Sequence, residues 1–115
     1  RTPHADSAVR ACEDWLSEHF ADPDPVARAV EYAGVPERTI KRRFKTATGT
    51  SLMDHVQNLR IEEAKRLLET TDVPFDEIAA NVGYEDPGFC RRLFKRRTGL
   101  TPGHYRKMFQ AYDVG

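Results

Sequence analysis

The sequence predicts an all-α fold, and three observations support that prediction. Signals that start and stop helices recur along the chain, with apolar residues at helical spacing between them. No window alternates apolar and polar residues for long enough to indicate a strand. The third observation is an internal repeat, in which Phe44 and Gly49 return 50 residues later as Phe94 and Gly99.

Each predicted helix follows an N-cap residue or a proline, and several are followed by a glycine. Ser7 is the expected cap of the first helix, and Asp24 before Pro25 is the expected cap of the second. Ser51 and Asp54 make a start like a capping box for the longest helix. The helices are expected over about 7–20, 25–33, 36–47, 51–70, 75–82, 87–98 and 102–109.

Length and composition fit one domain, or two very small ones that share a core. No segment approaches the ~20 apolar residues of a membrane span, and no signal-peptide pattern opens the chain. Cys12 and Cys90 are too few for a disulfide framework or a zinc site, and the histidines show no ligand spacing. We therefore expect a cytoplasmic protein without a metal or a cofactor.

Charge is segregated along the chain, although the formal net charge is zero. Residues 38–45 and residues 91–97 each hold five cations and no acid, so ten of the 18 Lys and Arg lie in two short segments. Residues 1–35 instead hold three cations and seven acids. A polyanion responds to the local field rather than to the net charge, so this distribution favours a nucleic-acid partner.

The repeat indicates a duplicated helix-turn-helix unit, because each copy has a short helix, a turn with a glycine, and a second helix rich in cations. In the first copy, Ile40 and Phe44 lie four apart and face the first helix, while the cations between them face outward. Cys90 and Phe94 repeat that arrangement in the second copy. A solvated basic face on an ordinary helical bundle would explain one such helix, but two copies at the same place favour DNA reading.

Three stretches are more specific than a helix-turn-helix pattern alone. They are residues 59–68 with Thr71 and Asp72, residues 76–84, and residues 92–96 followed by Gly99, Pro102, Tyr105 and Arg106. With these stretches the chain resembles, from about Val9 to Phe109, the C-terminal DNA-binding domain of the AraC/XylS family of bacterial transcription regulators. The residues in these stretches are also similar to those of the subgroup whose N-terminal domain has a DJ-1/PfpI-like fold.

The resemblance implies about seven helices, with two helix-turn-helix subdomains joined by a long linker helix. It divides the chain into a tail or linker at 1–6, a first subdomain at 7–50, a linker helix at 51–70, a second subdomain at 71–110 and a tail at 111–115. A helix of ~20 residues spans about 30 Å, which is comparable with the ~34 Å of one DNA turn. We therefore expect the two recognition helices to enter successive major grooves.

The resemblance also implies residues that contact DNA. By motif match, the base-contacting positions fall on Arg38, Lys41, Arg42, Pro87, Gly88, Arg91 and Arg92. Backbone contacts, which position a protein without reading sequence, are expected from Thr39, Lys45, Lys95 and Arg96. Arginine and lysine donate to guanine O6 and N7, and a good bidentate pair is worth roughly 1–3 kcal/mol of discrimination.

Some positions depart from the family pattern. Arg43 stands where an apolar residue is common, and we expect its stem to pack on the core while its charge reaches the surface. Pro87 and Gly88 lack polar side chains, so base reading there depends on the two arginines that follow or on DNA shape. Cys90 replaces an aromatic residue or a leucine, which predicts a smaller second core. The hypothesis is that the second unit is the less stable and the less sequence-specific of the two.

The expected partner is double-stranded operator or promoter DNA, with RNA polymerase as a further partner. The expected location is a bacterial cytoplasm, with the protein on the nucleoid when bound. This part of the chain is expected to be monomeric, while a preceding domain would sense the effector and form dimers.

Two other functions stay open at this stage. Some DNA-repair methyltransferases carry a similar double helix-turn-helix beside a cysteine cluster that binds zinc and accepts alkyl groups. Two isolated cysteines cannot form that cluster, and no other catalytic constellation stands out, so we expect no enzyme. A helical interaction module that has lost DNA binding would keep the same fold signature.

Overall fold

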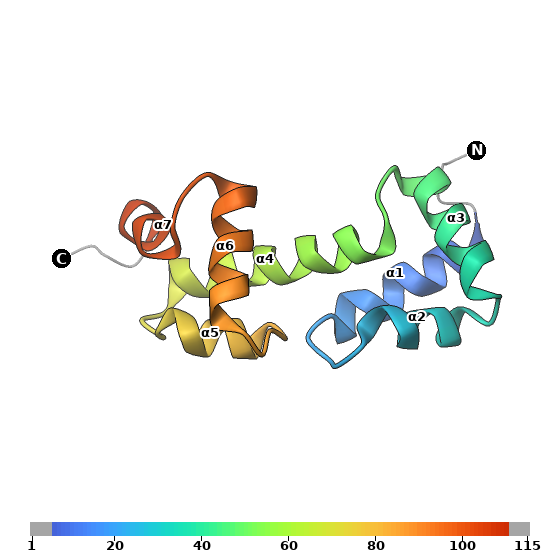
Figure 1. Ribbon diagram of the computed structural model, residues 1–115, viewed down its shortest axis with the longest axis horizontal. Coiled ribbons are helices and arrows are strands. Elements are labelled where there is room, and N and C mark those ends of the chain that lie inside the picture. Colours follow the sequence, from blue (N-terminus) through green and yellow to red (C-terminus); the bar gives the residue numbers. More distant parts are fainter. Residues whose placement is uncertain (1–5, 111–115) are drawn as a thin grey trace. The chain divides into compact units, whose positions relative to one another are not determined.

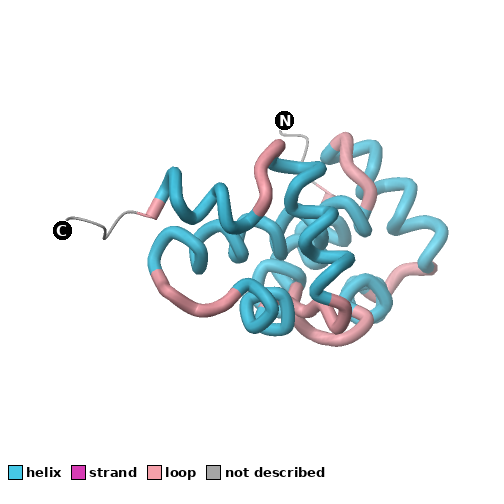
Figure 2. Tube along the Cα trace, turned by 60° about the vertical axis from the view of Figure 1, so that its left-hand side comes forward, coloured by secondary structure: helices cyan, strands magenta, loops and turns pink. Residues whose placement is uncertain are grey.

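The computed structural model describes residues 6–110, and every regular element in that range is an α-helix (Figure 2). The helices are α1 (Ser7–His19), α2 (Pro25–Ala33), α3 (Glu37–Thr48), α4 (Leu52–Thr70), α5 (Phe75–Asn81), α6 (Pro87–Thr98) and α7 (Pro102–Phe109) (Figure 1). The all-α prediction is confirmed, and no helix end differs from its predicted position by more than one residue. No helix within residues 6–110 is long and apolar enough to cross a membrane. Residues 1–5 of the tail predicted at 1–6, and the tail predicted at 111–115, lie outside the described residues.

The chain forms two compact units, and the division falls within α4, between Leu59 and Arg60. The first unit contains α1, α2, α3 and the beginning of α4. The second contains the remainder of α4 with α5, α6 and α7. Each unit therefore holds one helix-turn-helix, α2 with α3 in the first and α5 with α6 in the second.

In the first unit, α1 packs against both α2 and α3 (Figure 1). This packing follows from the apolar stripe of α1, in which Val9, Cys12 and Leu16 recur at helical spacing and are fully buried. The other buried members of this core are Ala8, Ala29, Ile40, Phe44, Leu52 and Val56. Ile40 and Phe44, which the sequence predicted to face inward, therefore anchor α3 in this core.

The second unit has its own core, in which α6 packs against both α5 and α7. Its buried members are Ile61, Ala64, Leu68, Ile78, Ala79, Val82, Cys90, Leu93, Phe94 and Tyr105. Among the described residues these ten compare with nine in the first core, so the expectation of a smaller second core is not confirmed. Tyr105 explains part of the difference, because its ring packs edge-on against Phe94, 5.4 Å between centroids.

Two predicted helix starts need correction. The cap of α1 is Asp6 rather than Ser7, since Asp6 Oδ1 accepts hydrogen bonds from the N–H groups of Ala8 (3.0 Å) and Val9 (3.3 Å). Asp24 does precede α2, but it has a left-handed backbone (φ 48°) and its side chain makes no capping hydrogen bond. Asp tolerates that conformation better than most residues, and Pro25 supplies the start signal instead. The predicted start at Ser51 is confirmed, because its hydroxyl accepts from the N–H of Asp54. Asp86 caps α6 and Thr101 caps α7 in a similar way.

Helices α3 and α6 also end in the same way. The Thr48 hydroxyl donates to the carbonyl of Phe44 (2.8 Å) and accepts from the N–H of Thr50 (3.1 Å). Thr98 makes the same pair of contacts with Phe94 and Leu100. The glycine after each threonine has a left-handed backbone, with φ of 78° and 82°. The sequence repeat is therefore a structural repeat down to individual hydrogen bonds.

Candidate nucleic-acid interface

In each helix-turn-helix, a glycine lies in the turn between the first helix (α2 or α5) and the cationic second helix (α3 or α6). Gly34 has φ 75°, and its N–H donates to the carbonyls of Val30 and Glu31. Gly83 has φ 111°, and its N–H donates to the carbonyl of Ala80. A residue with a Cβ would be strained at either position, so the glycines allow both tight turns. The second turn is longer, running over residues 82–86 rather than 34–36.

Helix α3 has one buried apolar face and one exposed cationic face. Ile40 and Phe44 are fully buried against α1 and α2. Arg38, Arg42 and Lys45, at intervals of four and three, are exposed on the opposite face. Helix α3 therefore presents three of the predicted DNA-contacting residues together on one surface.

The remaining predicted residues of α3 lie at the flanks of that surface. Thr39 is half-buried. The Lys41 ammonium lies 2.7 Å from Glu37 Oε2, one helical turn earlier. Arg43 follows the sequence expectation, because its stem is half-buried and its Nε donates to Asp6 Oδ2 at 2.7 Å. Partial burial opposes the effect, but the hydrogen bonds from Arg43 and from two backbone N–H groups hold the pKa of Asp6 below its ordinary value.

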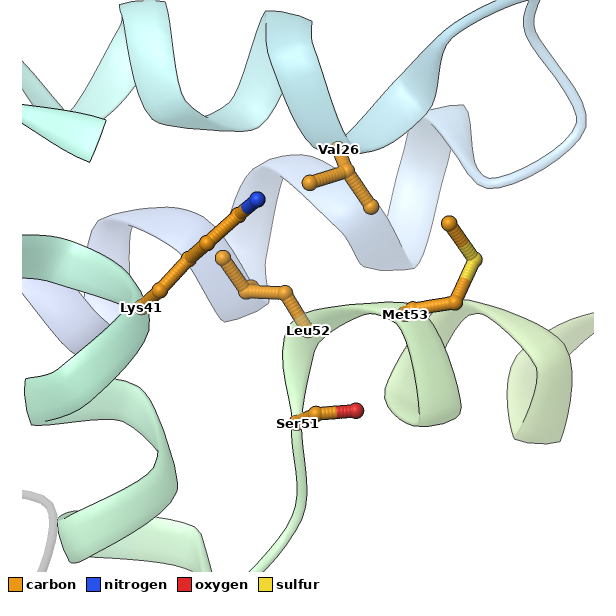
Figure 3. A pocket seen from close by; sticks show the side chains of 5 residues that line it. All are labelled: Val26, Lys41, Ser51, Leu52 and Met53. Carbon is orange, nitrogen blue, oxygen red and sulfur yellow. The ribbon is translucent and has the colours of Figure 1, made fainter. Parts of the chain in front are cut away.

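A pocket lies beside α3 in the first unit, lined by Val26, Lys41, Ser51, Leu52 and Met53 (Figure 3). The side chain of Lys41 extends toward Val26 along one wall of this pocket. The pocket volume of about 180 Å³ is below the ~300–1,000 Å³ typical of a small-molecule site. Lys41 therefore lines this small pocket at the edge of the cationic face.

Helix α6 repeats this two-faced design. Cys90, Leu93 and Phe94 are buried in the second core. On the opposite side of the helix, three charged residues that were predicted to contact DNA are exposed, namely Arg92, Lys95 and Arg96. Cations in the last turn also stabilise the helix through its dipole, so Lys95 and Arg96 have a structural role in addition to the predicted one.

Gly88 has a specific spatial role at the start of α6. A Cβ on Gly88 would lie 3.2 Å from Asp86 Oδ1 and 3.4 Å from Arg92 Nη1. The tighter approach is to Asp86, while the guanidinium of Arg92 lies alongside the backbone at ordinary contact distance from that point. Gly88 stays a predicted base contact, and Arg92 is its neighbour on the helix surface.

Arg91 differs from Arg92 because it is held by α5, the first helix of its helix-turn-helix. Its Nη2 lies 2.8 Å from Asp76 Oδ1 on α5. Its guanidinium carbon lies 5.4 Å from the centre of the Phe75 ring, a cation–π distance. Of the two arginines predicted to read bases from α6, Arg91 therefore has an intramolecular acidic partner.

Both cysteines are buried free thiols with no exposed surface. Burial raises the pKa of the Cys12 thiol and that of the Cys90 thiol to about 11. Because the thiolate is the nucleophilic form, neither side chain suits an alkyl-accepting role. Cys90 is a core residue, as the sequence predicted.

One outward residue and three acidic partners were not predicted from the sequence. Phe89 is an exposed aromatic side chain (38%) in the first turn of α6. The sequence offers no signal for this position, because Phe89 lies four residues before the buried Leu93, at the spacing of a core residue. Glu37 and Asp76 pair with the predicted site residues Lys41 and Arg91, and only the Glu37 spacing is visible in the sequence. Asp6 pairs with Arg43, which was not predicted to contact DNA.

Residues 29–108 match a family model described as a helix-turn-helix domain. Over 105 residues the chain is 31% identical to the arabinose operon regulatory protein of Salmonella typhimurium, which covers 90% of this chain and 37% of that protein. The chain thus spans little more than a third of the length of the curated relatives it matches.

Two solved structures extend the similarity to the whole fold. One is the DNA-binding domain of the global transcriptional factor AdpA in complex with a target DNA. It is 31% identical with a TM-score of 0.85, over 96% of this chain and 100% of that chain. The other is the C-terminal domain of AraT, a response regulator from Geobacillus stearothermophilus. It is 26% identical with a TM-score of 0.90, over 97% of this chain and 93% of that chain.

Proposed function

Because this chain belongs to the AraC/XylS family of helix-turn-helix transcription regulators, we propose that α3 and α6 are its DNA recognition helices. The chain is a sequence-specific DNA-binding part of such a regulator, not an enzyme. The observation that carries the assignment of the helices is their shared design. Each is the second helix of its helix-turn-helix, buried on one face and cationic on the other.

Within each recognition helix, we assign base reading to the centre of the outward face. Arg42 and Arg92 are equivalent in the repeat, are exposed, and lie opposite the buried Phe44 and Phe94. Either guanidinium has the fork geometry that suits guanine O6 and N7. Arg38 is one turn before Arg42 and is assigned the same role.

Contacts to the DNA backbone are assigned to the cations nearer the helix ends and flanks. Lys45 and Lys95 are equivalent in the repeat and exposed, and Arg96 is exposed beside Lys95. Thr39 is half-buried and is assigned a weaker backbone contact. Lys41 and Arg91, which have acidic partners, exchange those partners for DNA if they act as base contacts.

A binding titration at several salt concentrations tests these roles. Arg42→Ala and Arg92→Ala are expected to weaken binding to a cognate site by about 5- to 150-fold, the equivalent of roughly 1–3 kcal/mol. Lys95→Ala is expected to weaken all sequences about equally and to reduce the salt dependence by about one phosphate contact. Arg10→Ala, an exposed cation on α1, is the matched control and should change little. Equal losses for Arg10→Ala and Arg42→Ala would contradict the assignment.

Two units with one recognition helix each also suggest how a single chain binds. We propose that this part of the chain binds as a monomer and places α3 and α6 in successive major grooves. The family resemblance supports this proposal, as does the presence of both recognition helices in one chain. Sedimentation of the complex should give one chain per DNA site, whereas two chains per site would contradict it.

Other expectations rest on the family resemblance alone. Contact with RNA polymerase, and effector sensing and dimerisation by a preceding domain, remain predictions for the longer regulator. The finer resemblance to regulators with a DJ-1/PfpI-like N-terminal domain rests only on the residues found in the motifs between positions 59 and 106. None of the proteins compared above supports that subgroup.

A further inference from the structure

The outward face of α6 carries one aromatic side chain among its cations. Phe89 is 38% exposed, while its neighbour Cys90 is fully buried. Phe89 lies three residues before Arg92 and seven before Arg96, and this spacing places the three side chains along one stripe of the helix. The aromatic ring therefore shares the surface that we assign to DNA reading.

Phe89 is also the large outward side chain nearest the start of this recognition helix. Pro87 and Gly88 precede it, and neither carries a polar side chain. The N-terminal residues of a recognition helix are the ones that contact base edges. By the 50-residue repeat, Phe89 is equivalent to Thr39 of α3, and Gly88 is equivalent to Arg38. The first turn of α6 therefore offers DNA an apolar ring, whereas the first turn of α3 offers Arg38.

The surroundings of Phe89 hold the ring on one side and leave the other side open. Its ring lies 5.5 Å from that of Tyr84, tilted by 53°. Tyr84 is half-buried and lies beneath the guanidinium of Arg60, 4.8 Å from the ring centre to the guanidinium carbon. A ring positioned in this way loses little conformational freedom when it makes a new contact.

In the major groove, the apolar group that distinguishes one base from the others is the 5-methyl group of thymine. A phenyl ring has no hydrogen-bond donor or acceptor, so this methyl group is the feature it suits. We propose that Phe89 contacts the 5-methyl group of one thymine and makes the second unit select thymine at that position. This inference rests on the proposed function, in which α6 enters the major groove.

Base analogues test the contact with one chemical group changed at a time. The site is a duplex that the wild-type chain enriches from a random DNA pool. Each thymine in the half read by α6 is replaced in turn by deoxyuridine, which lacks only the methyl group. At one position the wild type is expected to lose about fourfold in affinity, the equivalent of roughly one buried methyl group. At that same position, 5-methylcytosine should be preferred to cytosine.

Phe89→Ala should bind the thymine and deoxyuridine duplexes equally at that position while keeping its preferences elsewhere. Phe89→Leu should keep part of the discrimination. Met108→Ala, which removes an exposed apolar side chain from α7, is the matched control and should discriminate like the wild type. Thermal unfolding of each variant separates a folding defect from a contact defect, because a folding defect weakens both duplexes alike.

Two results would overturn the inference while leaving the proposed function intact. One is a wild-type chain that binds its selected site but is indifferent to deoxyuridine at every thymine. The other is a Phe89→Ala variant that keeps the full preference for thymine. A chain that enriches no sequence at all, and shows no salt-dependent DNA binding, would overturn the proposed function and this inference with it.

Discussion

Arg91 and Asp76 join the two helices of the second helix-turn-helix, with Arg91 Nη2 2.8 Å from Asp76 Oδ1. Both side chains are at least half exposed, at 50% and 69%, so the pair contributes little to stability. Its consequence lies in DNA binding. A phosphate or a base that approaches Arg91 competes with the carboxylate of Asp76.

Asp76→Asn is therefore expected to tighten binding to all DNA sequences by a few-fold. The substitution frees Arg91 for DNA and removes one negative charge near the recognition helix. A plot of log affinity against log salt should become steeper by up to ~0.9, the slope of one added phosphate contact. Glu77→Gln makes the same charge change on the same helix and is the control. Equal effects of the two substitutions would show that Arg91 gains nothing from release, and weaker binding of Asp76→Asn would show that Asp76 instead orients Arg91.

Two tyrosines in the second unit are expected to respond differently to removal of the hydroxyl group. The Tyr105 hydroxyl donates to Glu69 Oε2, which joins α7 to α4, and burial together with this partner raises the pKa of Tyr105 above its ordinary value. Tyr105→Phe should lower the free energy of unfolding by about 1.5–3 kcal/mol, the range for a hydrogen bond to a charged group.

Tyr84→Phe is the matched comparison. The Tyr84 hydroxyl is buried, which raises its pKa, and the Arg60 guanidinium that lies close to its ring opposes part of that shift. The hydroxyl makes no hydrogen bond of ordinary geometry among residues 6–110. Removing it should leave the free energy of unfolding unchanged or raise it, because an unpaired buried hydroxyl carries a desolvation cost. Urea unfolding of both variants provides the measurement. If the two substitutions change the free energy of unfolding by the same amount, the hydrogen bond between Tyr105 and Glu69 does not stabilise the fold.

His55 is expected to make the stability of the first unit depend on pH. Its ring packs edge-on against Phe44, 5.3 Å between centroids. Burial lowers the pKa of His55 below its ordinary value of 6.5, and the carboxylate of Glu13 opposes only part of that shift. The unfolded chain then binds the proton more tightly than the folded one. The stabilising contribution is complete above pH 6.5 and is lost as the pH falls through the folded-state pKa.

Urea unfolding between pH 7 and pH 5 should therefore show falling stability for the wild type. His55→Gln cannot titrate, and its stability should change less over that range. Below pH 5, Asp6 and Glu63, whose pKa values are lowered in the folded chain, begin to lose their own contributions to stability. The two proteins are therefore compared above pH 5. Parallel curves for the two proteins would remove His55 as the cause.

The helices could be predicted almost to the residue because their ends depend on local chemistry. Pro87 and Gly99 mark the limits of α6 whatever surrounds them. The cap of α1 was harder, because Asp6 and Ser7 are adjacent and both favour that position. Asp6 also has a partner, Arg43, 37 residues away, and such a contact exists only in the folded chain.

The same limit applies to the candidate interface. Periodicity placed Arg42 and Arg92 outward, and both are exposed. The partner of Arg91 lies 15 residues away on another helix, so the sequence alone did not show it. Phe89 was missed because a single apolar residue is ordinarily assigned to the core, and only its exposure separates it from Cys90.

Selection of bound sequences from a random DNA pool tests the central claim most directly, with the wild type, Arg42→Ala and Arg92→Ala compared side by side. The wild type should enrich a site with two boxes about one helical turn apart, ~10–10.5 base pairs between centres. Arg42→Ala should lose sequence preference in one box and Arg92→Ala in the other. Enrichment of no sequence by the wild type, or of the same two boxes by both variants, would contradict the assignment of α3 and α6 as recognition helices.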